Sequence, residues 1–201
     1  DNRIYHNNFI GNHKHTHVFY CSGSRTNYTD YWDNGSEGNY WSGYDGVDSN
    51  NDGIGETPVT IYAVFNIDHY PLMGVFRCYN TSLNCPVNVV SNSTIEDFQY
   101  IESNSTIKLR VSNMTADQTR GFCRMTIPHA LLRPCYNVVI NDTVVPYNIV
   151  FEDANQSVIY FDYEHSTLDI IIIPELASSV LIAVFMVATL LAIIQRKRRV
   201  N

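Results

Sequence analysis

Apolar and polar residues alternate with a period of two through much of the second half of the chain, as they do in strands that bury one face. Asn, Asp, Ser, Thr and Pro residues, which favour turns, separate the runs. We therefore predict an antiparallel β-sandwich of immunoglobulin-like type over residues 86–173. Its expected strands are Thr94–Ile101, Thr106–Val111, Phe122–Ile127, Tyr136–Ile140, Val144–Val150, Val158–Tyr163 and Leu168–Ile173.

The alternation gives way to a continuous apolar run near the C-terminus. Leu176–Ile194 carries no charge and, as a helix, is long enough to cross a hydrocarbon core of ~30 Å. Arg196-Lys-Arg-Arg199 follows at once. The positive-inside rule then predicts one transmembrane helix over residues 174–195, a cytoplasmic tail over 196–201, and residues 1–175 outside. A buried core helix fits this basic flank less well.

Pro174-Glu175 partly resembles archaeal sorting tails, which are cleaved and replaced by a lipid. Those motifs usually carry an aromatic residue after the acid, where Leu176 stands here. We therefore favour a retained membrane span. Because a membrane segment ends a chain that begins at Asp1 without a signal peptide, we expect a C-terminal fragment of a longer exported protein.

Charge and sequons agree with an exterior location. Four of the thirteen basic residues lie at 196–199, so residues 1–175 hold nine basic and twenty acidic residues. This acidic balance disfavours nucleic acid and favours cations. An excess of N-x-[ST] sequons indicates glycosylation, although a β protein rich in Ser, Thr and Asn would also contain some. The acceptors are Asn27, Asn34, Asn80, Asn92, Asn104, Asn113, Asn141 and Asn155.

Five cysteines are an odd number for an oxidising compartment. The shortest pairings are Cys78 with Cys85 and Cys123 with Cys135, which leaves Cys21 free or paired with a missing part. The spacing fits no metal finger, and the connectivity remains open.

Residues 31–73 hold both tryptophans and a run of oxygen-bearing side chains at alternate positions. The run matches D-x-N-x-D-G, in which a tight loop points its oxygens at one hard cation and glycine permits the sharp turn. The expected Ca²⁺ ligands are Asp48, Asn50, Asp52, Ile54 through its carbonyl, and Glu56. The alternative is a turn cluster whose side chains bond their own backbone.

Two further groups of side chains have chemistry of their own. His13, His15 and His17 share one face if their segment is a strand, and imidazole suits copper or zinc. A polar face or loop is the commoner explanation of such spacing. Trp32, Tyr40 and Trp41 either stack on a carbohydrate or cap the apolar end of a repeat fold.

The first 74 residues contain the ordered motifs Asn2-x-Ile4-x-x-Asn7-Asn8-Phe9-x-x-Asn12, Trp32-Asp-Asn-Gly35, Gly38-Asn-Tyr-Trp-Ser42, Asp52-Gly-Ile-Gly-Glu56-Thr-Pro58 and Asn66-x-Asp68-x-Tyr70-Pro-Leu-Met73. With these motifs the segment bears a likeness to the terminal part of archaeal NosD-type right-handed parallel β-helix proteins, which are grouped with carbohydrate-binding and sugar-hydrolase modules. The likeness implies a last coil and cap over residues 1–74, followed by a linker over 75–85. The copper label of that family does not by itself extend to this chain.

We therefore expect a mainly β cell-surface protein, anchored in the membrane by Leu176–Ile194, with a scaffold or adhesion function and no catalytic residues in this chain. Surface polysaccharide or glycoprotein is the expected partner, and Ca²⁺ the expected ion. The alternatives are a polysaccharide-active enzyme whose catalytic residues lie upstream, and a copper-handling protein. Upstream coils bearing clustered Asp, Arg and Lys would favour the enzyme.

Overall fold

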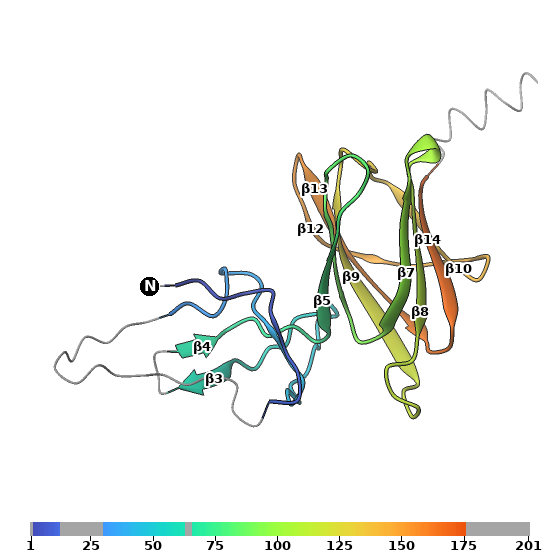
Figure 1. Ribbon diagram of the computed structural model, residues 1–201. Helices are drawn as coiled ribbons and strands as arrows, with labels where there is room; N and C mark the ends of the chain where they lie inside the picture. Colours follow the sequence, from blue (N-terminus) through green and yellow to red (C-terminus); the bar gives the residue numbers. More distant parts are fainter. Residues whose placement is uncertain (1, 13–29, 63–65, 176–201) are drawn as a thin grey trace, which may run out of the picture.

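A computed structural model describes residues 2–12, 30–62 and 66–175, and it is mainly β (Figure 1). Two five-stranded antiparallel sheets form a body over residues 75–174. One sheet has the order β11-β10-β14-β8-β7, with bounds Thr143–Val145, Tyr136–Ile140, Leu168–Pro174, Thr106–Ser112 and Thr94–Ile101. The other has the order β12-β13-β9-β6-β5, with bounds Asn148–Glu152, Gln156–Glu164, Arg120–Pro128, Val87–Ser91 and Val75–Tyr79. A single 3-10 turn, η2 over Glu102–Asn104, joins β7 to β8.

The alternating pattern packs the two sheets face to face. In β8, Ile107, Leu109 and Val111 are buried, while the side chains between them are exposed. These three belong to one core cluster with inward side chains from both sheets, including Met125 and Ile170. Each fully buried aliphatic side chain contributes roughly 1.5–3 kcal/mol, so this core is the main source of the body's stability.

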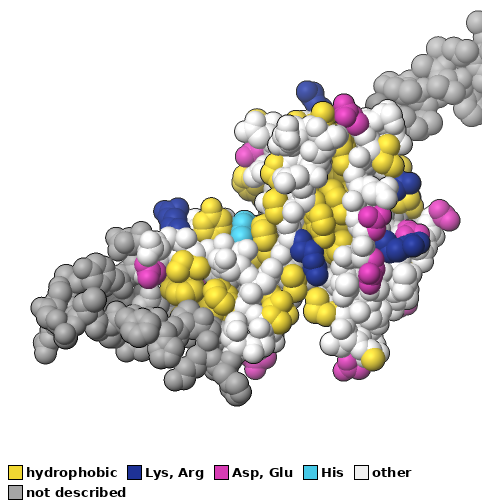
Figure 2. Space-filling model, in the orientation of Figure 1, with side chains coloured by type: hydrophobic (Ala, Val, Ile, Leu, Met, Phe, Trp, Pro, Cys, Tyr) yellow, Lys and Arg dark blue, Asp and Glu magenta, His cyan; other side chains and the backbone are white. Residues whose placement is uncertain are grey.

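The rim of this core shows at the open side of the body, between β5 and β7. Tyr79 of β5 and Phe98 of β7 stack there with ring centroids 4.3 Å apart. In Figure 2 hydrophobic side chains are visible between the two sheets on this face. The aromatic pair thus covers the core where β-strands do not.

The sequence-based prediction of antiparallel β structure is confirmed, but one strand, β6, was not among the expected strands, and two boundaries differ. Residues 75–79, expected in a linker, are β5, which pairs with β6 along its whole length. The expected strand Val144–Val150 is two strands in different sheets, because Pro146 between them lacks the N–H that a ladder needs. The body therefore begins at Val75, directly after the N-terminal part.

The N-terminal part consists of three passes of chain, residues 2–9, 31–42 and 66–73, which we call the parallel stack. β1 (Asn8–Phe9) pairs in parallel with β2 (Tyr40–Trp41), and Tyr40 forms a parallel bridge with Leu72. Asn8, Tyr40 and Leu72 thus follow one another at intervals of 32 residues, while the parallel bridge of Arg3 with Tyr31 spans 28 residues. A hairpin of β3 (Val59–Tyr62) and β4 (Asn66–Asp68) leads into the third pass.

Polar side chains hold the three passes together from inside. Asn7 donates through its backbone N–H and its amide to the Asn39 side chain, at 3.1 and 3.0 Å. The carboxylate of Asp68 accepts hydrogen bonds from the Asn39 backbone at 2.8 Å and from Trp41 Nε1 at 2.8 Å. Gly38 is required here, since a Cβ at this position would overlap the Asp68 carboxylate. Asn39 and Asp68 are both fully buried and hydrogen-bonded, as buried polar groups usually are.

The parallel stack packs on the outer face of the β12-β13-β9-β6-β5 sheet. Leu72 of the third pass is buried with Val90, Phe122 and Tyr160, which alternate with core-facing residues on β6, β9 and β13. Both faces of these central strands are therefore covered, which explains the continuous apolar run at residues 158–161. Among the described residues no helix is long and apolar enough to span a membrane. The predicted membrane segment 176–194 lies outside them.

Candidate functional site: the groove between the stack and the body

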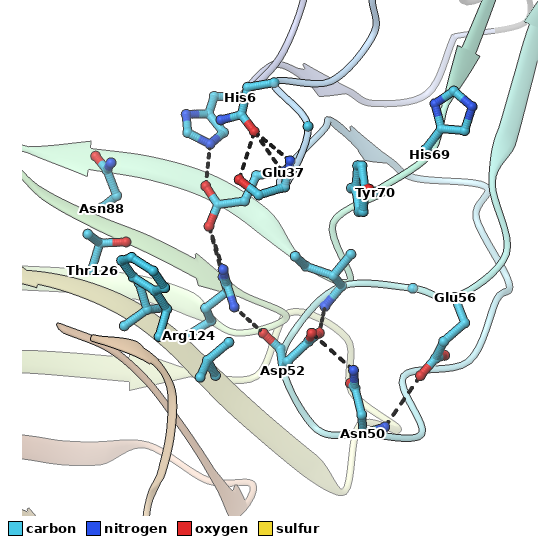
Figure 3. Close-up of a pocket in the computed structure, with 18 of the residues that line it drawn as sticks. His6, Glu37, Asn50, Asp52, Glu56, His69, Tyr70, Asn88, Arg124 and Thr126 are labelled. Carbon is cyan, nitrogen blue, oxygen red and sulfur yellow. Dashed lines mark hydrogen bonds and ion pairs between the residues drawn. The ribbon is translucent and has the colours of Figure 1, made fainter. Parts of the chain in front are cut away.

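A polar groove of about 810 Å³ opens between the parallel stack and the outer sheet of the body (Figure 3). The stack and its loops provide one wall, and β6, β9, β12 and β13 provide the other. The side chains used below are His6, Glu37, Asp52, Glu56, Tyr70, Asn88, Arg124, Thr126, Phe151 and Gln156.

Arg124 of β9 connects the two walls. Its Nε and Nη2 atoms donate to Glu37 Oε1 at 3.0 and 2.6 Å, and its Nη1 donates to the Asp52 carbonyl at 2.7 Å. His6 Nε2 lies 2.6 Å from the other Glu37 oxygen. The side chains of Arg124 and Glu37 are only 6 % and 14 % exposed. One carboxylate thus joins the first and second passes of the stack to the body.

The environment of Glu37 favours its charged form. Burial by itself raises the pKa of Glu37, but the hydrogen bond from His6 and the nearby Arg124 guanidinium outweigh it and lower the pKa to about 2. Removing one partner of such a buried pair leaves an uncompensated charge, which is far more costly than losing an exposed pair.

This lowered pKa predicts a loss of stability in acid. Because the folded pKa is about 2 and the ordinary value is 4.5, the contribution of Glu37 is complete above pH 4.5 and falls as the pH drops toward 2. We expect the difference in melting temperature between wild type and Glu37→Gln to shrink over this range. Thermal denaturation at a series of pH values measures it, and a constant difference would contradict the assignment.

The loop at residues 48–56 borders the groove and forms a tight turn. Asp48 accepts hydrogen bonds from the backbone N–H groups of Asp52 and Gly53, at 3.0 and 2.8 Å. Gly53 has a φ of +83°, and a Cβ there would lie 3.0 Å from Cβ of Arg124. Glu56 accepts from the backbone and hydroxyl of Ser49, at 2.8 and 2.7 Å. Gly53 thus lets the loop turn and approach Arg124.

These hydrogen bonds bear on the predicted calcium site. Asp52 Oδ1 accepts the N–H of Ile54 and its Oδ2 accepts from the Asn50 amide, so the expected ligand oxygens serve the loop itself. Within residues 2–12, 30–62 and 66–175, no three His, Cys, Asp or Glu side chains gather closely enough to hold a metal ion. The geometry is that of the turn cluster, and calcium binding stays a prediction.

Asp48→Ala separates the two explanations. The bonds to Asp52 and Gly53 predict a loss of about 1–2 kcal/mol of unfolding free energy, equal with EDTA and with Ca²⁺. Chemical denaturation under both conditions measures the effect. A wild-type stability that rises with Ca²⁺, and does not rise in Asp48→Ala, would instead establish the ion site.

The tryptophans proposed to contact carbohydrate are buried. Trp32 is 6 % exposed and Trp41 is 2 % exposed, and Trp41 stacks on Phe9 with ring centroids 4.2 Å apart. Trp32 Nε1 donates to the Asn66 amide oxygen at 3.2 Å. Tyr40 is half-buried against the apolar contact with the body. The tryptophan rings therefore pack the stack, and the expectation that they face a sugar is wrong.

The structure forms neither of the two shortest disulfide pairings. Cys78, Cys85, Cys123 and Cys135 are all free thiols. Cys123 lies in the core of the body, whereas Cys135 is exposed, so the pair would require a core side chain to reach the surface. Cys78 is exposed, while Cys85 packs against the core cluster. Burial raises the pKa of the Cys123 thiol, which makes it unreactive.

Some of the remaining predicted site residues lie outside the described residues, and the others lie within them. His13, His15, His17, Cys21 and the sequon residue Asn27 lie outside the described residues. Asn92 uses its amide inside the fold, donating to the Arg120 carbonyl and accepting from the Phe122 N–H. The Asn80, Asn104, Asn113, Asn141 and Asn155 residues are exposed, and Asn34 is half-buried beside the groove. Glycosylation stays a prediction.

Sequence reasoning missed His6, Glu37 and Arg124. One signal was present, since Arg124 is a charged residue inside an otherwise apolar strand run. Its partner Glu37 lies 87 residues away in the sequence, and spacing alone does not reveal such a pair.

Comparisons of the chain with protein-family models, with curated proteins and with solved structures find no match. The resemblance to NosD-type proteins therefore stays a prediction.

Proposed function

We propose that this chain belongs to an exported cell-surface scaffold that holds a parallel β-helix at a fixed angle on a two-sheet spacer. One retained helix, Leu176–Ile194, anchors it in the membrane, with the basic tail in the cytoplasm. Its work is adhesion and display at the cell surface.

The observation that carries this proposal is the rigid junction between stack and body. Arg124, Glu37 and the Asp52 carbonyl bridge the two parts, and Leu72 packs into an apolar contact beside them. A flexible linker would let the two parts move independently, whereas a buried ion pair and a packed interface fix their orientation. Fixed orientation is what a display scaffold needs.

The position at which the chain leaves the body, after β14, also supports the proposed scaffold. β14, the last strand, belongs to the sheet that does not carry the stack (Figure 1). The Glu175 N–H donates to the Cys135 carbonyl at 2.9 Å, so the chain is held until just before the apolar segment. If the chain enters a membrane just after Glu175, the stack lies on the side of the spacer that is turned away from the membrane. The intervals of 28 and 32 residues between parallel passes lie within the roughly 20–50 residues that are typical of repeat folds.

Thiol labelling of intact cells tests the topology. In a variant with Cys21, Cys85 and Cys135 changed to serine, the exposed Cys78 is the reactive thiol, because Cys123 is buried. We expect a membrane-impermeant maleimide to label Cys78 on intact cells. When Cys78 is also changed to serine and Asn201→Cys is added, labelling should require permeabilisation.

The same two variants provide the control, and they also define the results that would contradict the proposed orientation. Both should react equally after permeabilisation, which shows that each thiol is available. Failure to label Cys78 on intact cells, or labelling of Asn201→Cys without permeabilisation, would overturn the proposed orientation. Recovery of the protein in the soluble fraction would overturn the membrane anchor.

A further inference from the structure

We propose that the groove between the parallel stack and the body binds a neutral oligosaccharide. This deepens the adhesion function proposed above and rests on it for the source of the glycan. Its volume of about 810 Å³ lies within the ~300–1,000 Å³ typical of small-molecule sites. The site differs from the tryptophan cluster that the sequence suggested, because those rings are buried inside the stack.

Two aromatic rings border the groove and remain open to solvent. Tyr70, in the third pass of the stack, is 38 % exposed, and Phe151 of β12 is 49 % exposed. An exposed aromatic ring offers a flat apolar face with a negative potential above it, which complements the C–H groups on one face of a pyranose. One ring comes from each wall, so a ligand between them would contact both parts of the protein.

The wall of the groove that the body provides carries three polar side chains that are open to a ligand. The side chains of Asn88, Thr126 and Gln156 make no hydrogen bond to the described part of the chain, although all three are half-buried. They lie on three adjacent strands, and Asn88 is the direct cross-strand partner of Thr126 (Figure 3). Because they are only half-buried and line the groove, these groups are accessible to a ligand. Sugar hydroxyls, which both donate and accept, match this set.

The charged side chains that line the groove favour neutral sugars over acidic ones. Glu37 is neutralised by Arg124, whereas the Asp52 and Glu56 carboxylates form no ion pair with a Lys or Arg side chain among the described residues. A carboxylate-bearing sugar would meet like charge there, which disfavours binding. A neutral sugar avoids this repulsion.

The walls are formed before a ligand arrives. Arg124 fixes Glu37 of one wall and the Asp52 carbonyl of the loop through hydrogen bonds of 2.6–3.0 Å. A site held in this way loses little conformational freedom on binding, which favours affinity.

Saturation-transfer NMR and calorimetry on the full chain in phospholipid nanodiscs test the proposal, since nanodiscs avoid sugar-based detergents. The probes are maltotriose, cellotriose, mannotriose and chitotriose, with trigalacturonate as the acidic comparison. We expect at least one neutral trisaccharide to bind, and Phe151→Ala and the double variant Asn88→Ala, Gln156→Ala each to weaken its binding at least tenfold.

Ile149→Ala is the matched control, because Ile149 is exposed on the same strand as Phe151 but does not line this groove. It should bind like wild type. The proposal fails if no neutral probe binds, if Phe151→Ala binds as tightly as Ile149→Ala, or if trigalacturonate binds best. Equal melting temperatures of the variants exclude misfolding, and a negative result here leaves the thiol-labelling test of surface anchoring unaffected.

Discussion

Replacing Arg124 by alanine is expected to lower the free energy of unfolding by about 3–5 kcal/mol. The substitution leaves the buried Glu37 carboxylate with His6 as its remaining ion-pair partner and frees the Asp52 carbonyl that Arg124 holds at 2.7 Å. The attachment of the stack to the body weakens at the same time. Chemical denaturation of the wild type and the variant, followed by far-ultraviolet circular dichroism, measures the change.

Two further variants show whether the effect belongs to the buried pair. Arg110→Ala breaks an ion pair with Asp169 whose side chains are 57 % and 58 % exposed, and it should change stability little. The double variant Arg124→Met, Glu37→Gln removes both charges and should recover part of the loss. If Arg124→Ala behaves like Arg110→Ala, the pair does not hold the two parts together.

The second large effect is expected inside the stack. Trp41→Ala should lose about 3–5 kcal/mol, because it removes a large buried side chain and leaves a cavity beside Phe9. It also deprives the buried Asp68 carboxylate of the indole donor at 2.8 Å. Trp32 remains as the single fluorescent reporter of the stack, so its emission during denaturation measures the loss.

Trp41→Phe separates packing from hydrogen bonding, because it keeps an aromatic ring but removes the N–H donor to Asp68. We expect it to lose less stability than Trp41→Ala, yet more than the exposed control Tyr31→Ala. A loss below about 1 kcal/mol in Trp41→Ala would mean that the ring is not packed as the structure has it.

The stability of the stack depends on the hydrogen bonds that the buried Asp68 carboxylate accepts from neighbouring residues. Burial raises the pKa of Asp68, while hydrogen bonds from Trp41, Asn39 and Tyr70 oppose this. No Lys or Arg forms an ion pair with it among the described residues. The carboxylate is therefore stabilised by N–H donors alone, and each donor that is removed leaves a buried acceptor less satisfied.

Alternation of apolar and polar residues was enough to predict most strands of the body, because one face of each strand packs in a common core. It failed at β5, where exposed Cys78 and half-buried Arg77 obscure the pattern, and at Pro146, which divides one apolar run between two sheets. It also failed at β6, where buried residues on both faces remove the alternation. The D-x-N-x-D-G loop was recognised as a tight turn from its spacing. Its hydrogen bonds to its own backbone follow from three-dimensional geometry that spacing does not specify.

The groove could not be predicted from sequence for a related reason. Its walls come from chain segments that are brought together by the parallel stack and by the antiparallel sheet. Arg124 is conspicuous in its apolar strand run, but its partner Glu37 looks like an ordinary surface charge until the passes are paired. The tryptophans attracted attention by type, although their position between passes buries them.

The central claim is that the stack and the body form one cooperative unit, and hydrogen exchange of backbone amides tests it most directly. The amides of Tyr40 and Leu72 donate to carbonyls of neighbouring passes at 2.9 Å, and those of β9 lie in the body. The account predicts similar opening free energies for both groups in the wild-type chain. Rapid exchange at Tyr40 and Leu72 beside strong protection in β9 would show that the stack is not held by the body, and would contradict it.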